Sequence, residues 1–179
     1  FIHVDTYKAN IKTSNLVWHG EKLNAKHFGN IQLKSGELRI NCDGRLVGAK
    51  FVINMRSITN QDIESKQYKA MLVDDLKSSR FFDVEKYPEA IFQLLRSTPL
   101  GNNKFNLLGQ LNIKGKLAPV NIPLELKYQD NGKVMAIGEC SFDRTKYGLK
   151  YGSNSFFDNL GNEAISDIVR LEFEIELEK

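Results

Sequence analysis

The chain has 179 residues, of which 41 % are hydrophobic and 26 % are charged. This length suits one domain, residues 1–179, with enough apolar side chains for a core. The 25 basic and 22 acidic side chains give a net charge of +3, and the basic residues are scattered along the chain. Because phosphate binding needs a dense basic surface, nucleic acid is not an expected partner.

The front of the chain predicts a meander of strands. Apolar residues alternate with polar ones in three runs, which are joined by the turn signals Ser35-Gly36 and Asp43-Gly44. The apolar members of these runs are Ile31 and Leu33, then Leu38, Ile40 and Cys42, then Val47, Ala49, Phe51, Ile53 and Met55.

An amphipathic helix of about three turns is expected next, over Ile63–Leu76. Tyr68, Leu72 and Leu76 are spaced four residues apart, and charged residues occupy the other faces. Asn60 is the expected cap of its first turn.

A run rich in aromatic residues, Arg80–Phe92, follows the helix. Phe81 and Phe82 are adjacent, so no regular helix or strand points both side chains the same way, and Pro88 prevents a helix from continuing. The run must pack against the rest of the molecule, since it would otherwise expose a large apolar patch. We expect it to be a plug at the mouth of a β structure or a lipid-binding site.

The back half predicts a second meander. Apolar residues alternate along 105–113, 120–128, 134–142 and 169–177, with turns at Lys114-Gly115-Lys116 and Asp130-Asn131-Gly132. About eight or nine strands with one apolar face each must hide those faces on one another. The expected fold is therefore all-β: an extended antiparallel β-barrel of about eight strands with one helix at the barrel end. A strongly bent sandwich is the alternative.

Cys42 and Cys140 lie too far apart for a CxxC redox pair or a local zinc knuckle. Each falls in an alternating apolar row. We favour two small buried residues, with a single disulfide between two strands as the alternative.

No stretch approaches eighteen consecutive apolar residues, so no membrane span is expected. The first residue is Phe1 instead of Met. We therefore expect the N-terminus to be a cleavage product or a trimmed end, and an export signal that was removed would fit this.

Motifs typical of catalysis or metal binding are missing from the sequence. It contains no Gly-x-Ser-x-Gly elbow and no His-Glu-x-x-His pair. The spacing of His3, His19 and His27 matches no known set of zinc ligands. We therefore expect no catalytic residue and no metal.

Two polar residues remain candidates for function, His27 at a strand start and Arg144 beside Asp143. Arg144 either ties loop carbonyls or Asp143 together at a barrel rim, or binds the anionic or carbonyl head group of a ligand. An enzyme would have to use His27 and Arg144 as its chemical pair.

Six short strings form an ordered series along nearly the whole chain. They are VWHG at 17–20, HFG at 27–29, FVINMRSI at 51–58, FFDVEKYP at 81–88 followed by Phe92, GQLNIKG at 109–115 and DRTKYG at 143–148. Together they resemble the YceI-like family of bacterial proteins. The resemblance implies a lipocalin-like barrel that binds a polyisoprenoid chain, such as an isoprenoid quinone or a polyprenyl lipid, and export to the periplasm for many members.

The chain departs from the family pattern at four positions. The family often has Asp at Asn54, His at Asp75, Asp at Arg80 and Thr at Asn112. The fold is expected to tolerate all four. Asp75 and Arg80 flank the helix exit, so they are expected to affect the head-group preference more than the tail pocket.

The expected function is non-enzymatic binding, transport or storage of a long polyisoprenoid lipid, in the periplasm or secreted. Nine phenylalanines either fill the barrel or line a cavity, and the resemblance favours a cavity: Phe51, Phe81, Phe82, Phe92, Phe105, Phe142, Phe156, Phe157 and Phe173. His27 and Arg144 are the head-group candidates, and no catalytic cofactor is expected. A stress-related interaction protein with a packed barrel, an enzyme on an apolar substrate, and a homodimer joined through an edge strand remain open. The expected tail pocket comprises Phe51, Ile53, Met71, Leu72, Phe81, Phe82, Phe92, Phe105, Leu107, Leu111, Phe142 and Phe173.

Overall fold

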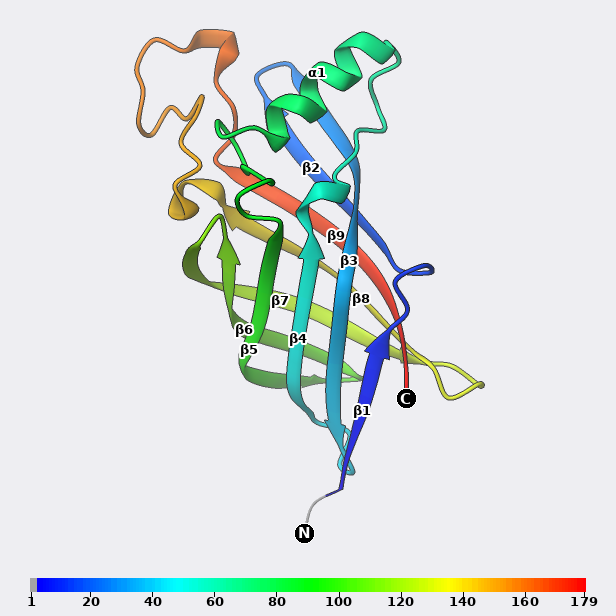
Figure 1. Cartoon of the computed structure of the whole chain (residues 1–179). Helices are drawn as coiled ribbons and strands as arrows, with labels where there is room; N and C mark the ends of the chain where they lie inside the picture. Colours follow the sequence, from blue (N-terminus) through cyan, green and yellow to red (C-terminus); the bar gives the residue numbers. More distant parts are fainter. Residues whose placement is uncertain (1–2) are drawn as a thin grey trace.

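The computed structural model describes residues 3–179, and its strands form one antiparallel sheet that closes into a barrel (Figure 1). Strands pair in the order β4-β5-β6-β7-β8-β9-β2-β3, and β3 then pairs with β4. The expected lipocalin-like antiparallel barrel is confirmed. The strands are β1 (Val4–Ala9), β2 (Asn15–Lys22), β3 (Ala25–Asn41), β4 (Leu46–Asn54), β5 (Glu89–Gly101), β6 (Lys104–Ile113), β7 (Lys116–Tyr128), β8 (Val134–Asp143) and β9 (Ile168–Glu178).

Two of the nine strands share one position in the barrel wall. Both β1 and β2 run antiparallel to β3, and both also pair with β9. The break between them is held by the Ser14 hydroxyl, which donates to the carbonyl of Asn10 over 2.6 Å. The ring therefore has eight positions although residues 3–179 form nine strands.

The helix α1 (Lys66–Lys77) lies across one end of the barrel (Figure 1). It begins later than expected, because Ser65 is its N-cap: the Ser65 Oγ accepts from the N–H of Tyr68. Asn60 does not cap it. The Asn60 Oδ1 instead accepts from the N–H of Ile63 in the preceding loop. Short 3-10 turns lie at Met55–Ser57, Arg144–Tyr147 and Gly161–Glu163.

β3 continues through Ser35 and Gly36, where a turn was expected. A register shift between Leu33 and Ser35 marks a bulge, which bends the strand without ending it. A Cβ atom on Gly36 would lie 2.7 Å from the ring of Phe51 on the paired strand. Glycine here makes room for a ring and does not reverse the chain.

The other predicted turns are confirmed. Asp43-Gly44 joins β3 to β4, Lys114-Gly115 joins β6 to β7, and Asn131-Gly132 lies between β7 and β8. The backbone φ angle is +76° at Gly115 and +79° at Gly132, a conformation that glycine adopts without strain.

Both cysteines are free: Cys42 is exposed and Cys140 is buried. The expected burial of Cys42 is wrong because it follows the last residue of β3 and enters the turn to β4. The disulfide alternative does not hold either. Within residues 3–179, no helix is long and apolar enough to cross a membrane.

The interior is filled at the end of the barrel away from α1. Side chains of Leu38, Leu126, Val134 and Leu177 are buried there and belong to the main apolar cluster. The end beneath α1 is different, because its inward side chains surround an open space.

Candidate functional site

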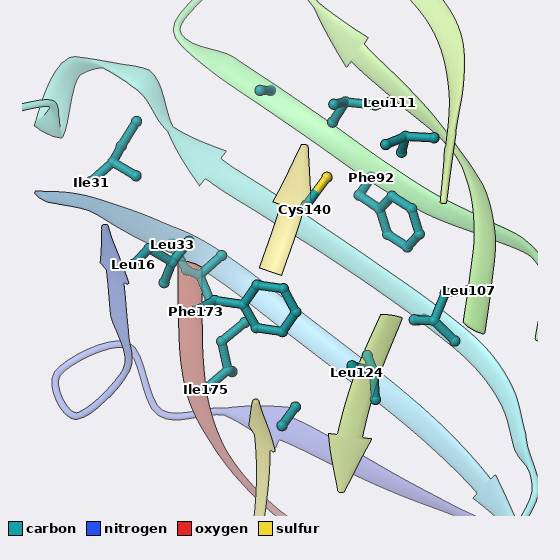
Figure 2. Close-up of a cluster of buried hydrophobic side chains, with 14 of the residues drawn as sticks. Leu16, Ile31, Leu33, Phe92, Leu107, Leu111, Leu124, Cys140, Phe173 and Ile175 are labelled. Carbon is teal, nitrogen blue, oxygen red and sulfur yellow. The ribbon is translucent and has the colours of Figure 1, made fainter. Parts of the chain in front are cut away.

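The open space is an apolar cavity with a volume of about 190 Å³. Inward-facing residues of the barrel strands form its wall, and Figure 2 shows the rings of Phe92 and Phe173 and the sulfur of Cys140 directed into the shared interior. Arg144 is the one charged residue among the described residues that line it. Burial raises the pKa of the Cys140 thiol to about 12, so this group is neutral. The cavity is therefore suited to a ligand made mainly of hydrocarbon.

Most of the residues predicted to hold a lipid tail line this cavity. Whether they contact a ligand remains a prediction. The residues are Phe51, Ile53, Phe81, Phe82, Phe92, Leu107, Leu111, Phe142 and Phe173.

Met71, Leu72 and Phe105 do not line the cavity, so their expected place in it is wrong. Met71 is 58 % exposed, because the face of α1 that meets the barrel carries Leu72 and Leu76 instead. Leu72 packs against the core above the cavity, and Leu76, one turn later, reaches the lining. Phe105 is buried at the start of β6, nearer the filled end.

Several lining residues were missed by the sequence prediction. Val169, Leu171 and Ile175 share the alternating row of Phe173 on β9, so extending that row would have found them. Trp18 faces inward on β2 by the same rule. Ile165 and Ser166 also line the cavity, but they lie in a loop with no periodic signal.

Two lining rings lie against glycines of neighbouring strands. A Cβ atom on Gly109 would lie 2.3 Å from the Phe92 ring and 2.6 Å from the carbonyl oxygen of Gln93. On Gly138 it would lie 2.7 Å from the Phe173 ring. These glycines let the rings lie close to the wall, which keeps the centre of the cavity open.

Replacing Gly109 with alanine is expected to lower the free energy of unfolding by about 1–3 kcal/mol, because the backbone carbonyl and the ring must both move. Gly20→Ala is the matched control, since its Cβ would meet only Trp18 at an ordinary 3.7 Å. Urea unfolding followed by circular dichroism measures both. Equal midpoints for the two variants would contradict this interpretation.

The mouth of the cavity lies where α1 returns to the barrel. Phe81 and Phe82 both line the cavity although they are adjacent, because they lie in a turn and not in a regular element. The N–H of Phe81 donates to the carbonyl of Ser78, and that of Phe82 donates to the carbonyl of Leu76. The aromatic run is thus part of the cavity wall as well as its cover.

A second segment, the loop between β8 and β9, closes the other side of the mouth. The ring of Tyr151 packs edge-on against Phe81 with centroids 5.5 Å apart. The guanidinium carbon of Arg80 lies 4.5 Å from the centre of the Tyr151 ring, and Arg80 also pairs with Asp75 at 3.4 Å. Asp75 and Arg80, the two departures from the family pattern at the helix exit, therefore lie at the mouth.

Arg144 fastens this loop from inside. Its Nε donates to the carbonyl of Ser166 at 2.9 Å, its Nη1 to that of Leu149 at 2.6 Å, and its Nη2 to that of Ile165 at 3.0 Å. The side chain is only 3 % exposed. Burial lowers the pKa of Arg144, while Asp167 and Asp143 oppose that shift. The predicted tie to loop carbonyls is present, whereas Asp143 accepts from Thr145 instead.

His27 does not line the cavity, and its contact with a head group stays a prediction. Its Nδ1 lies 2.8 Å from the Oδ2 of Asp62, whose Oδ1 accepts from the N–H of Phe28 and from Asn60. Burial raises the pKa of Asp62, but these hydrogen bonds outweigh it and lower the pKa. His27 fixes the segment that leads to α1. It is not brought together with Arg144.

Asp167 anchors the same loop through two hydroxyl groups. The Oγ of Ser153 donates to it at 2.5 Å and that of Ser155 at 2.6 Å. These bonds lower the pKa of Asp167, burial opposes them, and Arg144 adds a further lowering. The charged form of Asp167 is therefore favoured over the protonated form more strongly in the folded protein than in the unfolded chain.

Asp167→Asn is expected to be less stable than the parent at pH 7. Because the folded pKa of Asp167 lies below the unfolded value of about 3.9, its contribution is complete above that pH and is lost as the pH falls further. The difference in free energy of unfolding between parent and variant should become smaller below about pH 4. Urea unfolding at several pH values measures it, with Asp130→Asn in an exposed turn as the control. A difference that does not change with pH would contradict the expectation.

A family model described as the YceI-like domain matches residues 4–177. The chain belongs to the YceI-like family. None of the curated proteins matches the sequence. Within residues 3–179, no group of three histidine, cysteine, aspartate or glutamate side chains is placed to hold a metal ion in this YceI-like barrel.

Solved structures share the fold. BcnA of Burkholderia cenocepacia is 22 % identical with a TM-score of 0.75, over 94 % of this chain and 98 % of that one. A polyisoprenoid binding domain from Saccharophagus degradans, implicated in plant cell wall breakdown, is 14 % identical with a TM-score of 0.67, over 96 % and 97 %. The YceI protein of Campylobacter jejuni is 19 % identical with a TM-score of 0.58, over 75 % and 74 %.

Proposed function

We propose that this YceI-like protein binds one long isoprenoid lipid, a quinone or a polyprenyl lipid, inside its barrel and carries or stores it without chemical change. The observation that carries the proposal is a hydrocarbon-lined cavity in the part of the barrel beneath α1, with Arg144 as the one charged residue among the described residues that line it. The similar fold of a polyisoprenoid binding domain supports the same class of ligand.

Burial of the tail supplies the affinity. A prenyl unit has five carbons, and burial of each is worth about 0.8 kcal/mol, so each unit contributes roughly 4 kcal/mol before costs. Loss of translational freedom and ordering of the chain remove part of this gain. A few buried units are sufficient for tight binding.

Arg144 would orient the head group. A guanidinium carries five N–H donors, and carbonyls of the loop between β8 and β9 accept from three of them. The remaining donors suit a carbonyl or an anionic oxygen at the mouth. The quinone and polyprenyl classes both offer such oxygens.

The test is direct. Solvent extraction of the purified protein and mass spectrometry should recover an isoprenoid, and added ubiquinone or menaquinone should raise the melting temperature. Trp18, the one tryptophan of the chain, lines the cavity and should be quenched by a quinone. Absence of extracted isoprenoid, together with no thermal shift and no quenching, would overturn the proposal.

The alternatives lose support from the geometry. A packed barrel is inconsistent with the cavity, into which Phe81 and Phe82 both face. The enzyme hypothesis required His27 and Arg144 to act together, but His27 bonds to Asp62 away from the lining. We retain binding as the function.

We propose a periplasmic or secreted location, which fractionation of cells that express the full gene would test. We also retain a homodimer, since β5 pairs with β4 only over Glu89–Gln93, and among the described strands its later residues pair with β6 alone. Sedimentation at several concentrations would contradict the dimer if only a monomer appeared.

A further inference from the structure

Large apolar side chains gather at the cavity end of the molecule and point outward. Phe156 and Phe157 are 49 % and 51 % exposed on the loop between β8 and β9, and Tyr68 and Met71 are exposed on α1. Figure 1 shows α1 and this loop at the same end of the barrel. Tyr151 links the loop to Phe81 at the mouth.

The two loop phenylalanines are held outward by an anchored turn. Their N–H groups both donate to the carbonyl of Ser153, whose side chain is buried and bonded to Asp167. The base of the turn is fixed inside the protein while both rings stand at its outer side. Adjacent exposed rings on a fixed turn indicate a contact surface.

Cations accompany these apolar groups. The Nζ of Lys150 lies 4.6 Å from the centre of the Phe156 ring. Lys66 and Lys69 lie in the first turn of α1, which has no acidic residue. Because the helix dipole disfavours positive charge at an N-terminus, these lysines do not serve the stability of the helix.

Two of the nearby acidic groups are paired with cations. Asp75 pairs with Arg80, and Glu163 pairs with Lys22 at 3.2 Å. Within residues 3–179, Lys66, Lys69 and Lys150 form no salt bridge. Glu64 just before α1, Asp74 on α1 and Asp158 on the loop are exposed, so the positive charge is local to the three lysines and does not extend over the whole end. Free lysines beside exposed rings complement anionic lipid head groups.

We propose that this end of the barrel docks on the surface of a bilayer that contains anionic phospholipids. Phe156, Phe157, Tyr68 and Met71 enter the interfacial layer, and the lysines contact the head groups. The mouth then faces the membrane, so a hydrocarbon ligand passes between bilayer and cavity without crossing water. The direction of ligand transfer rests on the proposed function, whereas the docking itself does not.

Flotation with vesicles free of isoprenoid tests the docking alone. The protein should float with vesicles of phosphatidylglycerol and phosphatidylcholine, and much less with phosphatidylcholine alone. The double variant Phe156→Ser, Phe157→Ser should lower the partition coefficient at least tenfold. The matched control is Val47→Ser, Tyr128→Ser, which removes side chains that are 46 % and 49 % exposed on β4 and β7, away from α1, and should bind like the parent.

A second variant pair separates charge from apolar contact. Lys66→Glu, Lys69→Glu should weaken binding to the anionic vesicles by at least fivefold and leave binding to neutral vesicles unchanged. Unchanged binding of both double variants, or no binding of the parent to anionic vesicles, would overturn the docking surface. Docking with no extracted isoprenoid, no thermal shift and no quenching of Trp18 by a quinone would sustain the surface and overturn only the isoprenoid ligand.

Discussion

Cys140→Phe is expected to weaken binding of an isoprenoid quinone at least tenfold, which corresponds to about 1.4 kcal/mol. Cys140 is buried on β8 and lines the cavity, so a phenyl ring there would occupy the space that the tail needs. The chain should still fold, because the cavity accepts part of the added volume. Titration of Trp18 fluorescence with menaquinone gives the dissociation constants.

Ser141→Phe is the matched control for this experiment. Ser141 is the next residue on the same strand and faces solvent, so its variant adds the same ring outside the barrel. It should bind the quinone like the parent. Parent-like affinity in Cys140→Phe, with the fold shown by circular dichroism, would mean that the ligand binds elsewhere.

Arg144→Met is expected to lower the free energy of unfolding by about 3–5 kcal/mol. The variant keeps much of the side-chain volume but leaves the carbonyls of Leu149, Ile165 and Ser166 without the donor that now satisfies them. Part of the loop between β8 and β9 should then detach from the barrel. Urea unfolding measures the stability, and limited proteolysis of the folded protein should cut within 149–166.

Lys146→Met serves as the control for the loss of positive charge, since Lys146 is exposed on the same 3-10 turn. Its stability should stay close to that of the parent. If Arg144→Met were as stable as the parent, the carbonyl contacts would not hold the loop.

The strands were readily predicted because their physical signal is local. Alternation along β9 separates Phe173 and Ile175 from the glutamates between them, and turns at Gly115 and Gly132 set the register of the meander. The same rule extended to every inward position of the strands would have found most of the cavity wall.

The rest of the site depends on how elements lie in space. Whether Met71 or Leu76 faces the cavity depends on how α1 is rotated about its own axis against the barrel. The spacing of apolar residues in the sequence does not fix that rotation. Ser35-Gly36 resembles a turn signal, but the glycine is needed for a steric reason: it makes room for the ring of Phe51 from the next strand. His27 meets Asp62 only after the chain has crossed β4, so the pair has no local signal.

The division of the interior into a filled end and an open end has a consequence for how the family can vary. Leu38, Leu126, Val134 and Leu177 hold the strands together at a distance from the mouth. Substitutions among the residues around the cavity leave these four side chains and their packing in place. Ligand preference can diverge there between relatives of low sequence identity while the same framework persists.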